Sequence, residues 1–156
     1  MRKYELTNET INCEGRILHR IRALLPFKDV KVGDLGGYIE KEENLSHSGF
    51  CWVYDSARVY ENARVYDNAR VCDSSKIFGT SQVYENAKVH DSAQVYGSAH
   101  VYGKAKVYNK ARVYGNAKVF GKARIHDSAR VYDEAMVYMY ARVYNNARVV
   151  TNICKN

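Results

Sequence analysis

The five histidines are the side chains of this sequence best suited to proton transfer or metal binding: His19, His47, His90, His100 and His126. A histidine works as a general base when a neighbouring group holds its ring in place, and no carboxylate is fixed by sequence beside any of them for that purpose. A zinc site built from three histidines takes two of its ligands from nearby positions, a spacing that is absent here. We therefore expect no metal site and no histidine-based catalytic centre from spacing alone.

A second possible chemistry is anion binding. Residues 92–126 contain seven lysines and arginines and no aspartate or glutamate, within a chain of formal net charge +7. Like charges held close together repel, so such a stretch is either sensitive to salt or occupied by an anion. The seven cations are Lys104, Lys106, Lys110, Arg112, Lys118, Lys122 and Arg124.

Other chemistries lack their signatures. The four cysteines show no CxxC spacing, and the chain has no phosphate-binding glycine-rich loop and no nucleophile elbow. The residues after Met1 contain no apolar run of the kind found in a secretory signal, and no apolar segment is long enough to cross a membrane. These features favour a cytoplasmic protein that keeps its thiols reduced and has no membrane partner.

The elements that position these side chains come from one repeated phrase. From residue 51 to residue 152 the chain consists of seventeen hexads of the type Ala-Arg-Val-Tyr-Asp-Asn, without insertion or deletion. The first residue is Ala in fourteen hexads and the third is always Val or Ile, whereas the second is mostly cationic and the fourth mostly Tyr. This alternation predicts a short strand with Ala and Val inside, and the Asp, Asn, Gly or Ser pair that follows predicts a bend.

A fixed short period indicates a solenoid, in which each strand pairs with the equivalent strand of the next coil, about 4.8 Å away. Because only Ala and Val point inward, the cross-section must be narrow, and three hexads per coil is the natural number. The prediction is specific, because it requires Val65, Val83 and Val101 to lie directly over one another.

The repeats resemble the hexapeptide-repeat superfamily. That resemblance implies an all-β fold, a single-stranded left-handed parallel β-helix of about six three-sided coils; the left hand rests on the resemblance alone. The chain departs from the usual pattern in placing an aromatic residue, eleven times Tyr, after the inward aliphatic. The resemblance implies that an acyltransferase of this superfamily would use acyl-CoA and a histidine between subunits, and would usually complete the site with an inserted loop; no loop is inserted after Cys51.

Residues 1–44 lack the period and are expected to cap the open first coil with a β-hairpin, followed by the solenoid at 45–152 and a short tail at 153–156. Phrases such as Gly36-Gly37-Tyr38-Ile39 and Cys51-Trp52-Val53-Tyr54 resemble the YdcK-like proteins of bacteria and prophages. Members are commonly labelled transferases because of their fold, and a fold does not fix an activity.

Three hexads per coil sort the outward residues onto three faces. The first face carries Arg64, Gln82, His100, Lys118 and Met136 beside Tyr66, Tyr84, Tyr102, Phe120 and Tyr138. The second face carries Arg70, Lys88, Lys106, Arg124 and Arg142 beside Tyr54, Cys72, His90, Tyr108, His126 and Tyr144. The third face carries Arg58, Lys76, Gln94, Arg112, Arg130 and Arg148 beside Tyr60, Phe78, Tyr96, Tyr114 and Tyr132.

These columns predict an anion-binding site at the second face and its adjoining corners. Its residues are Lys88, His90, Lys104, Lys106, Tyr108, Lys122, Arg124 and His126. An alternative interpretation is purely structural, with rings stacking between coils, arginines lying over the rings and corner acids neutralising the rest.

The last coils change character, because Met appears at outward and corner positions and the tail is too short to be a capping helix. We expect an apolar self-association surface there, giving a dimer or trimer. Its residues are Met136, Tyr138, Met139, Tyr140 and Val150.

Together these features favour a non-enzymatic, oligomeric scaffold that binds nucleic acid, a nucleotide or an acidic protein and needs no cofactor. A phage or prophage accessory role, including interference with host defence, fits the resemblance. The alternative is an acyltransferase that uses acyl-CoA, with its site between subunits and His90, His100 or His126 as the base.

Overall fold

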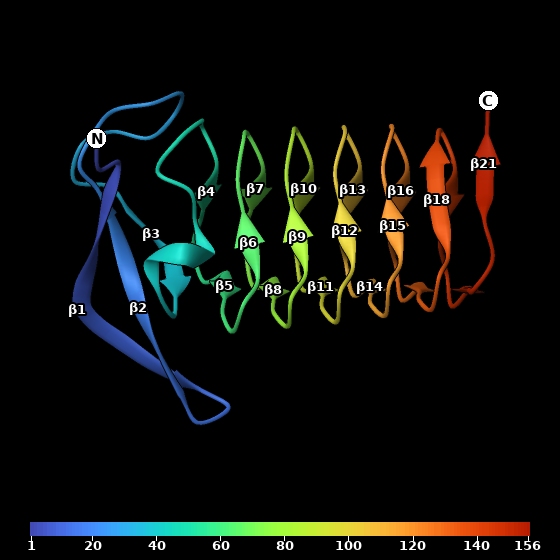
Figure 1. Cartoon of the computed structure of the whole chain (residues 1–156), viewed down its shortest axis with the longest axis horizontal. Helices are drawn as coiled ribbons and strands as arrows, with labels where there is room; N and C mark the ends of the chain where they lie inside the picture. The colour runs from blue at the N-terminus through green and yellow to red at the C-terminus, as the bar shows by residue number, and fades with distance from the viewer.

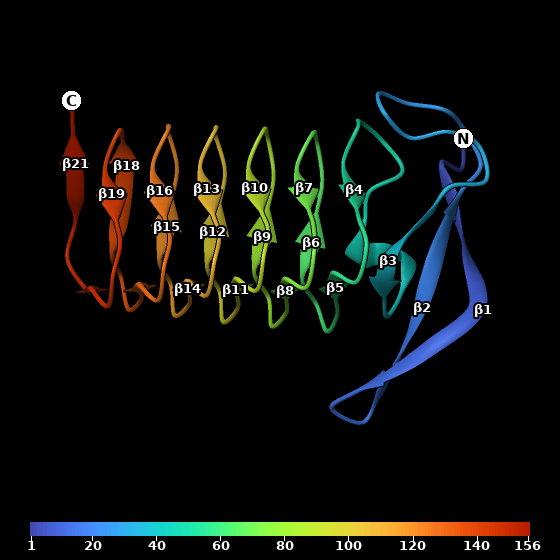
Figure 2. The same cartoon turned by 180° about the vertical axis from the view of Figure 1, so that it is seen from behind.

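The computed structural model describes all 156 residues as a β-hairpin followed by a three-sided parallel β-solenoid (Figures 1 and 2). It contains no α-helix, and therefore none that is long and apolar enough to cross a membrane. The one helical turn is the 3₁₀ turn η1 (Glu42–Asn44).

Each face of the solenoid is a ladder of short parallel strands, one from each coil. The first face contains β6 (Arg64–Val65), β9 (Gln82–Val83), β12 (His100–Val101), β15 (Lys118–Val119), β18 (Met136–Met139) and β21 (Ile153–Lys155). The second contains β4 (Trp52–Val53), β7 (Arg70–Val71), β10 (Lys88–Val89), β13 (Lys106–Val107), β16 (Arg124–Ile125) and β19 (Arg142–Val143). The third contains β5 (Arg58–Val59), β8 (Lys76–Ile77), β11 (Gln94–Val95), β14 (Arg112–Val113), β17 (Arg130–Val131) and β20 (Arg148–Val149).

The register confirms the eighteen-residue coil. Val65 pairs with Val83 and Val83 with Val101, so these valines lie over one another. Ala and Val of nearly every hexad are completely buried and form one continuous core. Where Ser75 and Ser81 replace Ala, each hydroxyl donates to a backbone carbonyl, of Cys72 and Phe78 respectively, so the narrow core accepts them without an unpaired polar group.

The corners follow a common geometry. The fifth residue of nearly every hexad has a positive φ, 57° at Asp91 and 65° at Gly97 for example. Asp, Asn and Gly tolerate this conformation better than other residues, which explains their recurrence at the corners.

The N-terminal cap is the predicted hairpin. β1 (Tyr4–Cys13) and β2 (Arg16–Ala23) pair antiparallel, and β2 pairs in turn with β3 (Leu35–Ile39). β3 then runs parallel to β5, with Ile39 opposite Val59. Parallel stacking therefore begins before residue 44, and the expected boundary between cap and solenoid falls inside a first coil that includes β3.

Candidate anion-binding face

The second face presents an unbroken column of cations. Arg70, Lys88, Lys106, Arg124 and Arg142 are paired in register, one from each successive strand of the sheet. Lys88, Arg124 and Arg142 are exposed and Lys106 is half-buried. The third face, by comparison, has Gln94 between Lys76 and Arg112, which interrupts its column.

The cations of this column have almost no partners within the chain. Arg70 alone makes a salt bridge, to Asp29 at 2.8 Å, and it also lies over the Tyr54 ring. No lysine or arginine after Arg70 makes a salt bridge to any carboxylate. The purely structural interpretation requires the corner acids to neutralise these lysines and arginines, and they do not do so through direct salt bridges.

The corner acids are instead bonded to the backbone of the next coil. The N–H of Asp91 donates to Asp73 at 3.0 Å, and that of Asn109 donates to Asp91 at 3.0 Å. The same bond joins Asn145 to Asp127 at 2.8 Å. The pKa of Asp91 lies below its ordinary value, chiefly because of the Asn109 N–H, with a smaller contribution from His90 and against the effect of burial. These carboxylates serve the turns, which leaves the neighbouring cations free.

Rings form a second column beside the cations. His90 stacks on Tyr108 and Tyr108 on His126, both with ring centroids 5.0 Å apart, and Tyr144 follows at 5.7 Å. His90 and His126 therefore lie on opposite sides of Tyr108 and cannot share one metal ion. Tyr108 and His126 have a neighbouring ring on both faces, whereas His90 and Tyr144, at the two ends of the column, each stack on one ring only.

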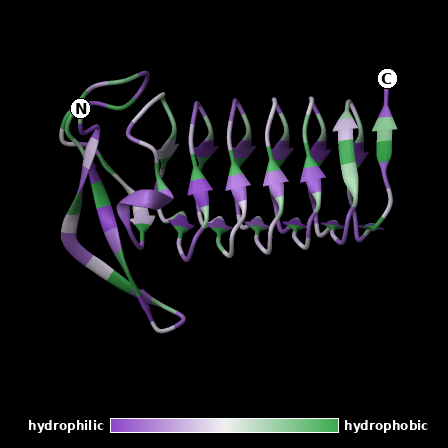
Figure 3. Cartoon of the chain, in the orientation of Figure 1, coloured by the Kyte–Doolittle hydropathy of each residue, from purple (hydrophilic) through white to green (hydrophobic).

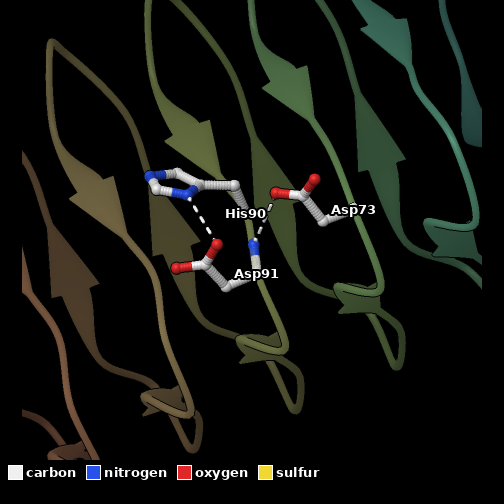
Figure 4. A group of neighbouring side chains, drawn as sticks. All are labelled: Asp73, His90 and Asp91. Carbon is white, nitrogen blue, oxygen red and sulfur yellow. Dashed lines mark hydrogen bonds and ion pairs between the residues drawn. The ribbon is translucent and has the colours of Figure 1, made fainter.

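The structure corrects the expectation that no carboxylate orients the histidines. Nδ1 of His90 lies 3.4 Å from Oδ1 of Asp91 (Figure 4), and Nδ1 of His126 lies 3.3 Å from Oδ1 of Asp127. In each pair the acid is the next residue in sequence, and the corner geometry turns it back toward the ring. The signal was present in the sequence, but adjacent residues of a strand normally point in opposite directions.

Asp73, His90 and Asp91 place three potential metal-ligand atoms within 4.8 Å of one another. Figure 4 shows that Asp73 accepts the backbone N–H of Asp91 while Asp91 faces the His90 ring. The hydrogen bonds that shape the corner are sufficient to account for this group.

The other predicted site residues lie at the margins. Lys104 and Lys122 occupy the corner between the first and second faces, where Nζ of Lys122 donates to the Tyr140 hydroxyl at 3.1 Å and lies over that ring. His100 lies on the first face, 3.4 Å from the Tyr84 hydroxyl. Burial, and then the charge of Lys118, lowers the pKa of His100. The structure thus keeps His100 apart from the two second-face histidines.

The residues predicted for self-association lie at the C-terminal coil. Met139, Tyr140 and Val150 are 45%, 56% and 44% exposed, whereas Met136 and Tyr138 are half-buried. Figure 3 shows apolar colouring along β18 and β21, in contrast to the hydrophilic residues of the preceding strands of this sheet.

Comparison with known proteins identifies the repeats. The profile described as YdcK Beta solenoid repeat matches residues 63–75 and 111–127. The Escherichia coli (strain K12) protein named Uncharacterized acetyltransferase YdcK is 38% identical over 63 residues, which cover 35% of this chain and 19% of that protein. The chain thus spans about a fifth of the length of this relative. The solenoid of this chain is similar to the YdcK β-solenoid repeat over these residues.

Proposed function

We propose that this protein is a cytoplasmic, non-enzymatic scaffold that binds single-stranded nucleic acid along its second face. The observation that carries the proposal is the column from Lys88 to Arg142, which repeats a cation in every coil without a carboxylate partner. Free cations in a row attract a polyanion and release its counterions on binding.

The ring column supports nucleic acid over an acidic protein. His90, Tyr108 and His126 each lie two residues after a cation of the column, and proteins that bind single strands combine aromatic side chains with a basic track. The coils rise by about 4.8 Å, so a strand lying along the solenoid axis meets a cation at least once per nucleotide. A sequence-independent mode is expected, because the pattern is the same in every coil.

The test is fluorescence anisotropy with a labelled single-stranded oligonucleotide across a salt series. A second-face variant, Lys88→Gln/Lys106→Gln/Arg124→Gln, should bind more weakly, and the slope of log affinity against log salt should shrink by about 2, as expected for three lost phosphate contacts. The matched control is the third-face variant Arg112→Gln/Arg130→Gln/Arg148→Gln, which removes the same charge. No binding at low salt, or equal weakening by both variants, would refute the proposal.

A second candidate function is acyl transfer. It is favoured by the name of the relative and by the pairs His90–Asp91 and His126–Asp127, which give two histidines an orienting carboxylate. Under this proposal acetyl-CoA should raise the melting temperature, and His90→Gln or His126→Gln should abolish acetyl transfer while preserving the fold. Absence of any shift at millimolar acetyl-CoA would count against it.

We also propose that the chain self-associates as a dimer or trimer through its C-terminal coil. The exposed Met139, Tyr140 and Val150 provide the apolar surface, which an identical copy would cover.

A further inference from the structure

One corner of the solenoid is longer than all the others. Leu45 pairs with Val65 and Val53 with Val71, so these two inward residues are equivalent members of the first coil. They are eight residues apart in sequence, whereas inward residues of later hexads are six apart. The additional residues form a loop around His47 to Gly49 at the corner between the first and second faces.

This loop lies where the first-face ring column ends. The N–H of Tyr66 donates to Val83 O, and the N–H of Ser46 makes the equivalent bond to Val65 O. Ser46 therefore occupies the position that an aromatic residue fills in the next five coils of this face, from Tyr66 to Tyr138. One side of the Tyr66 ring stacks on Tyr84 at 4.8 Å, and no protein ring stacks on its other side.

The ring column of the third face ends differently. Its terminal ring, Tyr60, is completely buried by the hairpin and packs with Cys13 and Leu18. Tyr66 has no such cover and instead lines a cavity of about 430 Å³, which Ser46, His47, Ser48 and Arg64 also line.

Two charged groups of this cavity have no partner within the chain. Arg64 and Glu43 are among the residues that line it, and neither side chain makes a salt bridge or a side-chain hydrogen bond. Glu42, by contrast, is bound by Arg2 and faces Nε2 of His47 at 3.6 Å. One unpaired guanidinium and one unpaired carboxylate thus belong to residues that line the same cavity as Tyr66.

Residues at the start of the N-terminal hairpin fix the position of the loop that lines the cavity. Buried Lys3 donates from Nζ to the carbonyl of Cys51 at 2.8 Å and to that of Gly49 at 3.4 Å. Nδ1 of His47 accepts the Lys3 backbone N–H at 3.2 Å, and its ring stacks on Tyr4 with centroids 4.2 Å apart. The site is therefore formed before any ligand arrives, which lowers the entropic cost of binding.

We propose that this cavity binds a guanine ring, which takes the missing place in the first-face column by stacking on Tyr66. Guanine presents the acceptors O6 and N7 on one edge, which suit the Arg64 fork. Its neighbouring edge presents N–H donors at N1 and N2, which suit the Glu43 carboxylate. Adenine offers an amino donor where Arg64 requires an acceptor, and pyrimidines offer less surface for stacking.

The test is isothermal titration calorimetry of the full chain with GMP, AMP and CMP. GMP should bind at least about tenfold more tightly than AMP, the discrimination expected of one bidentate contact to a base. Arg64→Gln and Glu43→Gln should each remove this preference, and Tyr66→Leu should weaken GMP about tenfold through lost stacking. The matched controls lie in the same columns away from the cavity: Lys118→Gln and Tyr102→Leu should leave GMP binding unchanged.

Equal affinity for the three nucleotides, or equal weakening by the controls, would overturn the proposal. This site stands independently of the nucleic-acid proposal, because it uses a different face. The second-face triple variant should bind GMP normally, and Arg64→Gln should bind the oligonucleotide normally.

Discussion

Single residues at the corners determine both the shape and the charge of this molecule. Asp91 combines a left-handed backbone with a carboxylate that accepts the Asn109 N–H, and Asn109 does the same one coil later for Asp127. Asp91→Asn should therefore keep the hydrogen bond and lose only the smaller part of the stability that depends on the carboxylate charge. Asp91→Ala should lose about 1 kcal/mol for the hydrogen bond and a further ~1 kcal/mol for the backbone conformation, whereas Asp91→Gly should lose the hydrogen bond alone. Urea unfolding measures the unfolding free energies of the three variants. A large loss of stability in Asp91→Asn would mean that the charge matters more than the hydrogen bond.

His100 gives stability a pH dependence at the same scale. Its pKa is lowered in the folded state by burial and by Lys118. As pH falls through the ordinary histidine range, near about 6.5, the unfolded chain takes up the proton first, so the unfolding free energy falls. His100→Gln should remove this part of the acid sensitivity, and Gln82 occupies the equivalent position one coil earlier, so the fold should tolerate it. Identical pH profiles for the two proteins, measured by thermal unfolding from pH 7.5 to 5, would contradict the prediction.

At the scale of strands, the buried valines are equivalent in sequence but unequal in surroundings. Val107 is fully buried with a coil on either side, whereas Val149 lies in the last strand of the third face and is 7% exposed. Val107→Ala should lower the unfolding free energy by about 2 kcal/mol, because it removes buried apolar surface and leaves a cavity. Val149→Ala should lower it clearly less. Chemical denaturation compares them, and equal costs would indicate that the terminal coil is packed as tightly as the centre.

The sequence could predict what the period controls. The strands, the valine stack, the faces and the ring columns follow from an eighteen-residue coil, and the register confirms them. It could not predict where the corner acids bond, because the contact of Asp91 with Asn109 depends on the twist and spacing of coils. The cavity beside Tyr66 was missed for a related reason: its longer corner lies before the regular repeats begin, and only strand pairing reveals Leu45 as part of a coil.

At the scale of the whole molecule, the solenoid is a rod whose two ends differ (Figure 1). The N-terminal end is covered by the hairpin and the aromatic cluster of Tyr4, Phe27 and Trp52. The C-terminal coil instead exposes Met139 and Tyr140 beside the edge strands β19, β20 and β21. Edge strands with exposed apolar side chains favour association with another copy.

Met139→Asp tests this association without disturbing the fold. Met139 holds a positive φ of 60°, and Asp67 holds the equivalent corner of an earlier coil at 57°, so aspartate suits the backbone. A charge at the centre of an apolar contact should weaken self-association by about tenfold or more. Sedimentation velocity over a concentration series should show an oligomer for the natural chain and a monomer for Met139→Asp. Val32→Lys, which alters a more exposed apolar residue in the N-terminal region, should leave the oligomer intact, and a natural chain that sediments only as a monomer would exclude the interface.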